Sequence, residues 1–143
     1  MYPKIEQLVI DQLKLLLETV TPSIAETLSD ANRFREFGII DLALPRRSGK
    51  SVAAHNLSQR LKAPVIYHSH HMMRMLDRPA YSSYTLDSLL SSPVTKVHIY
   101  GHIIADELSQ KQLTMLIDYL LYCISVKKAS PNLKLISLRT PYV

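Results

Sequence analysis

Four short, strongly apolar runs alternate with longer segments of helical periodicity along this chain. The runs are Ile39–Leu44, Ala63–His68, Val97–Ala105 and Leu133–Leu138, and each has the length and composition of a buried strand. A helical pattern, Ser51–Leu61, separates the first two runs, so that strand, loop, helix and strand follow one another within about thirty residues. This order predicts an α/β fold in three layers, with a mainly parallel central sheet flanked by helices.

Two long helices are expected outside this central pattern. Apolar residues recur at helical spacing over residues 4 to 20, which predicts an amphipathic N-terminal helix that ends at Thr21-Pro22. The same spacing over Leu108–Val126 predicts a second helix. Residues 69–95 are rich in Met, Ser, Tyr and Pro, and only a short helix near Tyr84–Ser91 is expected there.

The composition fits one domain. The chain has 143 residues, of which 47% are apolar and 20% are charged, and this is enough for one core and too little for two. No internal repeat or linker divides it. We therefore expect a single compact domain, in which residues 1–36 form an N-terminal helical segment and residues 37–143 form the α/β core.

The hydrophobic runs also bear on the compartment. No run approaches the 18 apolar residues that a membrane-spanning helix needs, and the first residues lack the pattern of a secretory signal. The lone Cys123 cannot form an internal disulfide, and its place on an apolar helix predicts a buried core residue. These features favour a soluble, cytoplasmic protein without a membrane partner.

Positive charge is concentrated in one part of the chain. Residues 1–44 hold four Lys or Arg and seven Asp or Glu, residues 45–78 hold seven and one, and residues 79–143 hold six and four. The net charge of +5 therefore arises in the segment 45–78. Such a segment suits a polyanion, either nucleotide phosphates or a DNA backbone, although a solvated basic face on an ordinary enzyme fits the charge equally well.

The sequence Pro45-Arg46-Arg47-Ser48-Gly49-Lys50-Ser51 lies between a predicted strand and a predicted helix, the context in which Gly-Lys-Ser binds phosphate. We expect Gly49 to let the backbone approach a phosphate, Lys50 to reach the outer phosphates and Ser51 to ligate Mg²⁺. The consensus GxxxxGK[ST] asks for a first glycine where this chain has Leu44. The loop therefore departs from the usual phosphate-binding pattern at one position.

A second motif, His102–Glu107, is an apolar run that ends in two adjacent carboxylates. In P-loop ATPases this arrangement places one acid on Mg²⁺ and the next beside the attacking water, which predicts these roles for Asp106 and Glu107. Since successive strand residues alternate in direction, Glu107 is expected to point away from Asp106. The alternative is that both acids merely begin the following helix, where they would suit its positive end.

Together these motifs resemble the ATPase domain of the large terminase subunit, the motor that packages DNA into tailed bacteriophage heads. That family commonly lacks the first glycine of the loop and carries an arginine in its early part, where this chain has Arg46 and Arg47. Its acidic strand ends in Asp-Glu, and a later strand ends in a Thr-Pro or Ser/Thr-rich coupling motif, as at Thr140-Pro141. The resemblance spans residues about 37 to 141 and implies a P-loop fold that hydrolyses ATP with Mg²⁺.

The resemblance also implies roles for single residues. Arg46 would stabilise the γ-phosphate, Glu107 would activate water, and Thr140 would couple hydrolysis to movement. In full, the candidate catalytic residues are Glu107, Lys50 and Arg46, the nucleotide contacts are Arg47, Ser48, Gly49, Lys50, Ser51, Val52 and Thr140, and the metal ligands are Ser51 and Asp106.

The resemblance further implies partners. DNA is the expected substrate of the motor, other packaging-complex proteins are expected to bind it, and a neighbouring subunit of a homo-oligomer would supply an arginine, for which Arg74, Arg78 and Arg139 are candidates. The motifs are closely spaced, and the chain leaves no room for the nuclease domain of a full terminase. We therefore expect either a fragment or a minimal relative that does not cut DNA.

Two other classes of function remain open at this point. A nucleotide or nucleoside kinase would use the same loop with an acceptor hydroxyl in place of water, but such kinases usually keep the first glycine and carry a lid of arginines. A non-catalytic module that binds DNA or a protein through a degenerate loop is the second, and Leu44 is its best support.

Histidines offer a weaker signal. His68, His70, His71, His98 and His102 flank the predicted strands, but no Cys or carboxylate lies at a ligand spacing from them. We expect them to be ordinary histidines rather than a metal centre.

Overall fold

The computed structural model describes residues 3–20, 22–69, 82–91 and 101–141. In these ranges five strands form one sheet in the order β1-β5-β4-β2-β3, and every neighbouring pair is parallel. The strands are β1 (Ile39–Ala43), β2 (Pro64–Tyr67), β3 (Ser82–Thr85), β4 (His102–Asp106) and β5 (Lys134–Arg139). The expected α/β class and the parallel sheet are confirmed.

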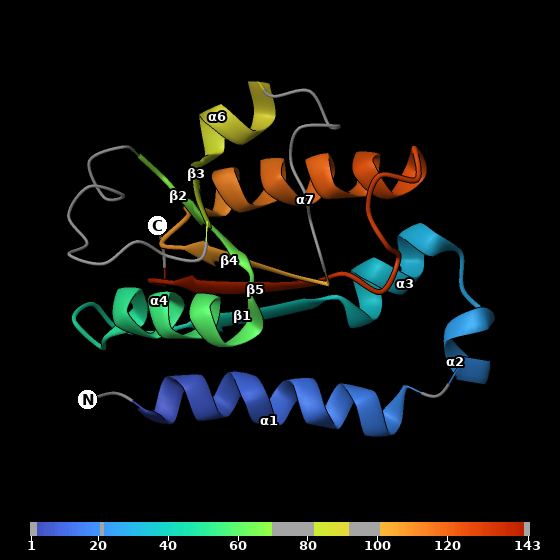
Figure 1. Ribbon diagram of the computed structural model, residues 1–143, viewed down its shortest axis with the longest axis horizontal. Helices are drawn as coiled ribbons and strands as arrows, with labels where there is room; N and C mark the ends of the chain where they lie inside the picture. Colours follow the sequence, from blue (N-terminus) through green and yellow to red (C-terminus); the bar gives the residue numbers. More distant parts are fainter. Residues whose placement is uncertain (1–2, 21, 70–81, 92–100, 142–143) are drawn as a thin grey trace.

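Helices cover both faces of the sheet (Figure 1). One side carries α1 (Pro3–Thr19) and α4 (Lys50–Leu61), the other carries α3 (Asp30–Phe37), α6 (Leu86–Ser91) and α7 (Gln110–Ser125), and the short α2 (Pro22–Glu26) follows α1. The strand β4 serves both layers, because Ile104 joins the core beneath α4 while Ile103 and Ala105 join the core beneath α7. Burial on both faces explains why the inner strands β2, β4 and β5 appear as continuous apolar runs.

The N-terminal helix shares a core with the strands. Ile5, Val9 and Leu13 of α1 belong to the same buried cluster as Leu57 of α4 and Ile104 of β4. The helical segment is therefore packed onto the α/β core through α4. No helix in the described ranges is long and apolar enough to cross a bilayer.

Most predicted elements are found within one or two residues of their expected ends. The helix expected from Leu108 begins instead at Gln110, because Ser109 caps it: the Ser109 side chain accepts from the Gln112 N–H and the Gln112 side chain accepts from the Ser109 N–H. The strand expected from Val97 is described only from His102, and Gly101, with φ +68°, precedes it. Residues 97–100 lie outside the described ranges.

One strand, β3, was not expected. The sequence predicted a helix near Tyr84–Ser91, whereas Ser82–Thr85 is a strand and the helix α6 begins at Leu86. The strand lies at the edge of the sheet and pairs only with β2. An edge strand needs no continuous apolar run, so its serines concealed it from a search for buried strands.

The chain path determines where a site can form. After β1 the chain turns into α4 on one face, and after β4 it turns into α7 on the opposite face, while β5 lies between the two strands. Connections that leave the carboxyl edge of a parallel sheet toward opposite faces open a crevice there. The two motifs singled out in the sequence lie in these two connections.

Candidate functional site

The loop between β1 and α4 ends in a helix start without a capping side chain. Gly49 precedes α4 with φ 90° and ψ 22°, in the left-handed region that glycine adopts without strain. The first helical bond runs from the Ala53 N–H to the Gly49 oxygen over 2.9 Å, so the amides of Lys50, Ser51 and Val52 lie ahead of the hydrogen-bonded ladder. A helix end of this kind favours an anion, and a phosphate is the usual one.

Lys50 is the buried cation of the site. Its side chain is only 2% exposed. The ammonium donates to the Leu44 oxygen at 3.2 Å and to the Pro45 oxygen at 2.7 Å, and it forms an ion pair with Glu107 Oε1 at 2.9 Å. Its three hydrogens therefore meet three acceptors, and the side chain is held between the loop and the acid that follows β4.

Asp106, the last residue of β4, is a buried carboxylate. The Ser51 hydroxyl donates to Asp106 Oδ2 at 2.9 Å. Burial raises the pKa of Asp106 to about 6; the hydrogen bond from Ser51 and the charge of Lys50 lower it, while the charge of Glu107 raises it further. The second oxygen, Oδ1, is buried and has no hydrogen-bond partner among the described residues.

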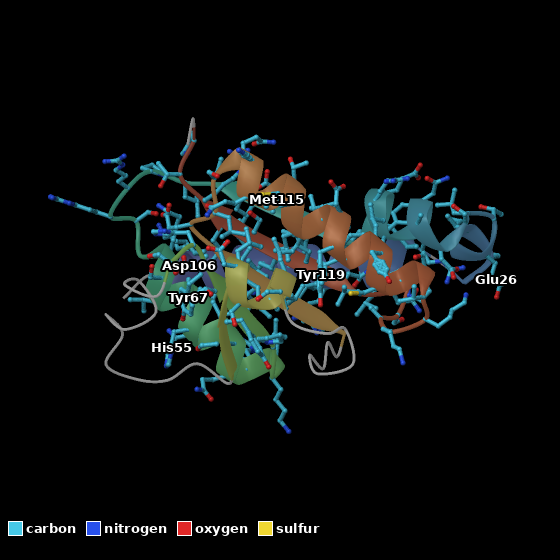
Figure 2. All side chains as sticks on the ribbon, turned by 90° about the horizontal axis from the view of Figure 1, so that it is seen from above. Glu26, His55, Tyr67, Asp106, Met115 and Tyr119 are labelled. Atoms are coloured by element: carbon cyan, nitrogen blue, oxygen red, sulfur yellow. The ribbon has the colours of Figure 1, made fainter. Side chains whose placement is uncertain are left out.

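Tyr67 closes the site on the side of β2. It pairs in register with Asp106 on the neighbouring strand, and both labelled side chains lie close together in Figure 2. Burial and then the nearby Asp106 carboxylate raise the pKa of Tyr67 to about 12. The ring is 1% exposed, so it helps to keep water away from Asp106.

Glu107 turns into the site through a left-handed backbone. Its φ is 59°, and its N–H donates to the Leu138 oxygen of β5 at 2.8 Å. The Thr140 hydroxyl donates to both carboxylate oxygens, at 3.1 Å to Oε1 and 2.9 Å to Oε2. A left-handed turn beyond β4, rather than the alternation of strand side chains, therefore sets the direction of Glu107.

The structure decides against the interpretation in which the two acids merely begin a helix. α7 starts at Gln110, its N-cap is Ser109, and no acid lies in its first turn. Asp106 and Glu107 instead contact Ser51 and Lys50, the first two residues of α4. The acids that follow one strand thus meet the loop that follows another.

Above these contacts lies a cavity of about 520 Å³. Five of the residues expected from the sequence line it: Arg46, Arg47, Ser51, Glu107 and Thr140. The buried Lys50 and Asp106 contact this lining through Glu107 and Ser51.

Two further residues of the loop sit differently. The Ser48 hydroxyl is buried without a hydrogen-bond partner in the described part of the chain. The Val52 side chain is absent from the cavity wall and the residue is 51% exposed, so Val52 can contribute only its backbone amide.

Sequence reasoning missed three residues that line the same cavity: His68, Ser109 and Gln112. Ser109 and Gln112 form the capping box of α7, whose Ser-x-x-Gln spacing could have been read from the sequence. His68 follows β2 and was considered only as a member of a histidine cluster. No short-range pattern places it beside the loop, because the pairing of β2 with β4 brings it there.

The chemistry of the site fits a magnesium ion. Magnesium prefers oxygen ligands. Water molecules and phosphate groups usually supply most of them, so one or two protein oxygens are enough. The Ser51 hydroxyl and the unpartnered Asp106 Oδ1 provide such a pair. The described ranges contain no group of three or more His, Cys, Asp or Glu side chains that could hold a metal without other ligands.

The two histidines of this set that the structure describes lie apart. His68 follows the carboxyl end of β2, whereas His102 begins β4 at the opposite edge of the sheet. His70, His71 and His98 lie outside the described residues, as do the candidate arginines Arg74 and Arg78. The third candidate arginine, Arg139, forms an ion pair within its own chain, with its Nε 2.9 Å from Asp41 Oδ1.

Within residues 45–69, the described part of the basic segment, the exposed cations form two groups. Arg46 and Arg47 lie in the loop before α4 beside the cavity, and Arg60 and Lys62 lie at the far end of α4. Twelve helical residues separate the two groups by about 18 Å. Only the first group can contact a ligand in the cavity.

The site thus joins a helix N-terminus, a buried ammonium, two oxygen ligands and a carboxylate oriented by a hydroxyl. Such a set can bind a phosphate anion together with a divalent cation and can hold a water molecule beside them. Comparison of the chain with protein-family models, with curated proteins and with solved structures finds no match.

Proposed function

We propose that this protein hydrolyses ATP with Mg²⁺, as a P-loop ATPase similar to the terminase motor, and that it acts on DNA. One observation supports this most: two motifs 55 residues apart meet at one sheet edge, with the Ser51 hydroxyl 2.9 Å from Asp106 Oδ2 and the Lys50 ammonium 2.9 Å from Glu107 Oε1. A phosphate-binding loop and a metal-binding acid are useful for hydrolysis only when they are adjacent.

Phosphate binding begins with an exchange at Lys50. In the structure its ammonium is paired with Glu107 and two carbonyl oxygens. A triphosphate at the start of α4 offers more negative charge than one carboxylate, so Lys50 turns to the phosphates and leaves Glu107. Arg46 and Arg47 line the cavity and add charge at its mouth.

The metal ligands would be Ser51 and Asp106. Mg²⁺ in this position would neutralise phosphate charge that grows in the transition state. The chain's contribution is to keep Asp106 buried, hydrogen-bonded through Oδ2 and open at Oδ1.

Glu107 is the proposed base. Once Lys50 has left, its carboxylate keeps the hydrogen bonds from Thr140, which fix its orientation. The oxygen of a bound water attacks the γ-phosphorus in line, the bond to the bridging oxygen breaks, ADP leaves, and the proton of the water passes to Glu107.

The test compares two variants of the purified chain in Mg²⁺-dependent ATP hydrolysis. Lys50→Met should lose both nucleotide binding and turnover. Glu107→Gln should bind ATP at least as tightly as the parent protein, because Lys50 is then released from its ion pair, while turnover should fall by roughly a hundredfold or more. Lys62→Met, at the exposed far end of the same helix, is the matched control.

Three results would contradict the proposal. If Glu107→Gln turns over ATP as fast as the parent protein, Glu107 is not the base. Turnover that appears only with an added nucleoside indicates a kinase. Loss of DNA binding in Lys50→Met, when the parent protein shows no ATP hydrolysis to begin with, indicates a non-catalytic module.

DNA and a homo-oligomer are the partners proposed for this activity. A terminase-like motor needs DNA to move, and the net charge of +5 favours a polyanion. An arginine from a neighbouring subunit would complete the cavity. Turnover per subunit that stays constant on dilution to the monomer would contradict the oligomer.

A further inference from the structure

A second cavity, of about 510 Å³, lies at the amino ends of the strands, opposite the candidate site. Its polar wall includes His102 and Lys134, the first residues of β4 and β5. The candidate site begins at the opposite end of the same strand, at Asp106, about 13 Å away along β4. The two cavities are therefore separate.

One wall of this cavity is apolar. Leu13, Leu16 and Leu17 of α1, together with Val20 directly after it, line the cavity at spacings i, i+3, i+4 and i+7. These residues lie on one face of the helix. Leu13 is buried in the core, whereas Leu17 is 79% exposed, so the apolar stripe of α1 continues beyond the part that packs on α4.

The facing wall carries the Lys134 ammonium beside the His102 imidazole. His102 and Lys134 are partners in the register of β4 and β5, so their side chains point to the same side of the sheet. The Lys134 ammonium donates to the Phe37 oxygen at 3.0 Å, and no described carboxylate lies within ion-pair distance of either residue. Burial lowers the pKa of both side chains, and Lys134 lowers the pKa of His102 further.

The positive charge of Lys134, beside a neutral His102, suits a singly charged anion. A carboxylate carries one negative charge at neutral pH, whereas a phosphomonoester carries nearly two.

We propose that this cavity binds a small amphipathic carboxylate, with its head group at Lys134 and His102 and its apolar body along Leu13, Leu16 and Leu17. The volume is that of an ordinary small-ligand site. The carboxylate accepts hydrogen bonds from the ammonium and the imidazole, and the apolar body covers the exposed part of the α1 stripe. This inference is independent of ATP hydrolysis.

The test is calorimetric titration of the full chain with dodecanoate below its micellar concentration. Dodecyltrimethylammonium has the same apolar chain and the opposite charge. We expect dodecanoate to bind one to one, and dodecyltrimethylammonium to bind at least tenfold more weakly. Equal binding of the two, or no binding of dodecanoate, overturns the proposal.

Variants locate the binding. Lys134→Met should weaken dodecanoate roughly tenfold or more, with Lys128→Met, an exposed lysine away from the cavity, as its control. Leu17→Asp adds a negative charge at the mouth and should weaken dodecanoate to the same degree. Its control is Leu15→Asp, which is 58% exposed on the same helix but does not line the cavity.

Leu17 is exposed enough that its replacement keeps the fold, so this arm does not depend on the stability of the Lys134 variant. A Leu15→Asp effect equal to that of Leu17→Asp overturns the location. Competition between dodecanoate and a non-hydrolysable ATP analogue for one binding event overturns it as well, because the two cavities lie at opposite edges.

Discussion

Asp106 shows how one residue can work against folding. Its carboxyl has a pKa of about 6 in the folded chain and an ordinary value of 3.8. The folded state therefore binds the proton more tightly than the unfolded state does. The free energy of unfolding therefore falls as pH rises from about 4 to about 6. Above about pH 6 the full cost of holding the ionised Asp106 carboxylate in the folded chain is present. A difference of this size corresponds to about 3 kcal/mol at most.

Asp106→Asn should therefore stabilise the protein when no metal is present. We expect the free energy of unfolding to rise by up to about 3 kcal/mol at pH 7.5 and to change little at pH 4, because the carboxyl of the parent protein is then protonated as well. Urea denaturation in a chelator at both pH values measures this. Asp118→Asn, at a position of α7 far from the loop, should have no such effect, and an Asp106→Asn protein that is less stable at pH 7.5 would refute the account.

Thr140 is a positioning residue for Glu107, because its hydroxyl donates to both carboxylate oxygens. Thr140→Val removes the donor and keeps the shape. We expect kcat for ATP to fall about tenfold with KM nearly unchanged, since the carboxylate is then free to rotate away from the water. Thr140→Ser, which keeps the hydroxyl, should restore most of kcat, and a Thr140→Ser protein as slow as Thr140→Val would exclude the hydrogen bond as the cause.

At the scale of the element, two glycines that precede strands differ in what surrounds them. Gly38 ends α3 before β1, and a Cβ there would lie 2.5 Å from Phe34 Cδ1 and 2.7 Å from the Leu133 oxygen. Gly101 precedes β4 with φ +68°, and a Cβ there would meet nothing within 4 Å. The first glycine is needed for close approach and the second for its backbone angle.

Gly38→Ala should therefore be the more damaging replacement. Backbone and ring must move apart to admit the methyl group, for about 2 to 3 kcal/mol of lost stability, whereas Gly101→Ala costs about 1 kcal/mol of backbone strain. Thermal and urea unfolding of both variants give the comparison. Equal losses would mean that Phe34 and the Leu133 carbonyl move away from Gly38 more easily than the close distances indicate.

Prediction from sequence worked best for elements that are buried on both faces. Pro64–Tyr67 and Lys134–Arg139 are largely apolar because they lie between other strands and beneath helices, and this composition is visible locally. β3 could not be found in this way, because Ser82–Thr85 is not an apolar run and its strand structure depends on pairing with β2. The turn at Glu107 was hidden for a related reason, since the β5 backbone and Thr140 hold it in place.

At the scale of the whole molecule, the exposed basic residues in the described part of the segment 45–69 divide into two groups at the two ends of α4. The group at the cavity, Arg46 and Arg47, suits a nucleotide. Arg60 and Lys62 lie about 18 Å away at the surface, where they can reach DNA phosphates without entering the cavity.

We expect the double variant Arg60→Ser, Lys62→Ser to weaken DNA binding. Each side chain that no longer neutralises a phosphate should reduce the slope of log K against log salt by about one. The slope should therefore fall by about two, while ATP hydrolysis without DNA stays unchanged. Filter binding over a salt series measures this. A double variant that loses ATP hydrolysis and keeps DNA binding would contradict the assignment of Arg60 and Lys62 to DNA.

The sequence by itself determined the α/β class, most strands and helices, and the identity of the residues that meet at the carboxyl edge of the sheet. These depend on hydrophobic periodicity and on side-chain chemistry, which are local. Tertiary structure alone decided the strand order, the left-handed turn that brings Glu107 to Lys50, the separation of the basic residues and the cavity beside α1. Each of these arises from contacts between segments distant in the chain, and no local pattern records which distant segments will meet.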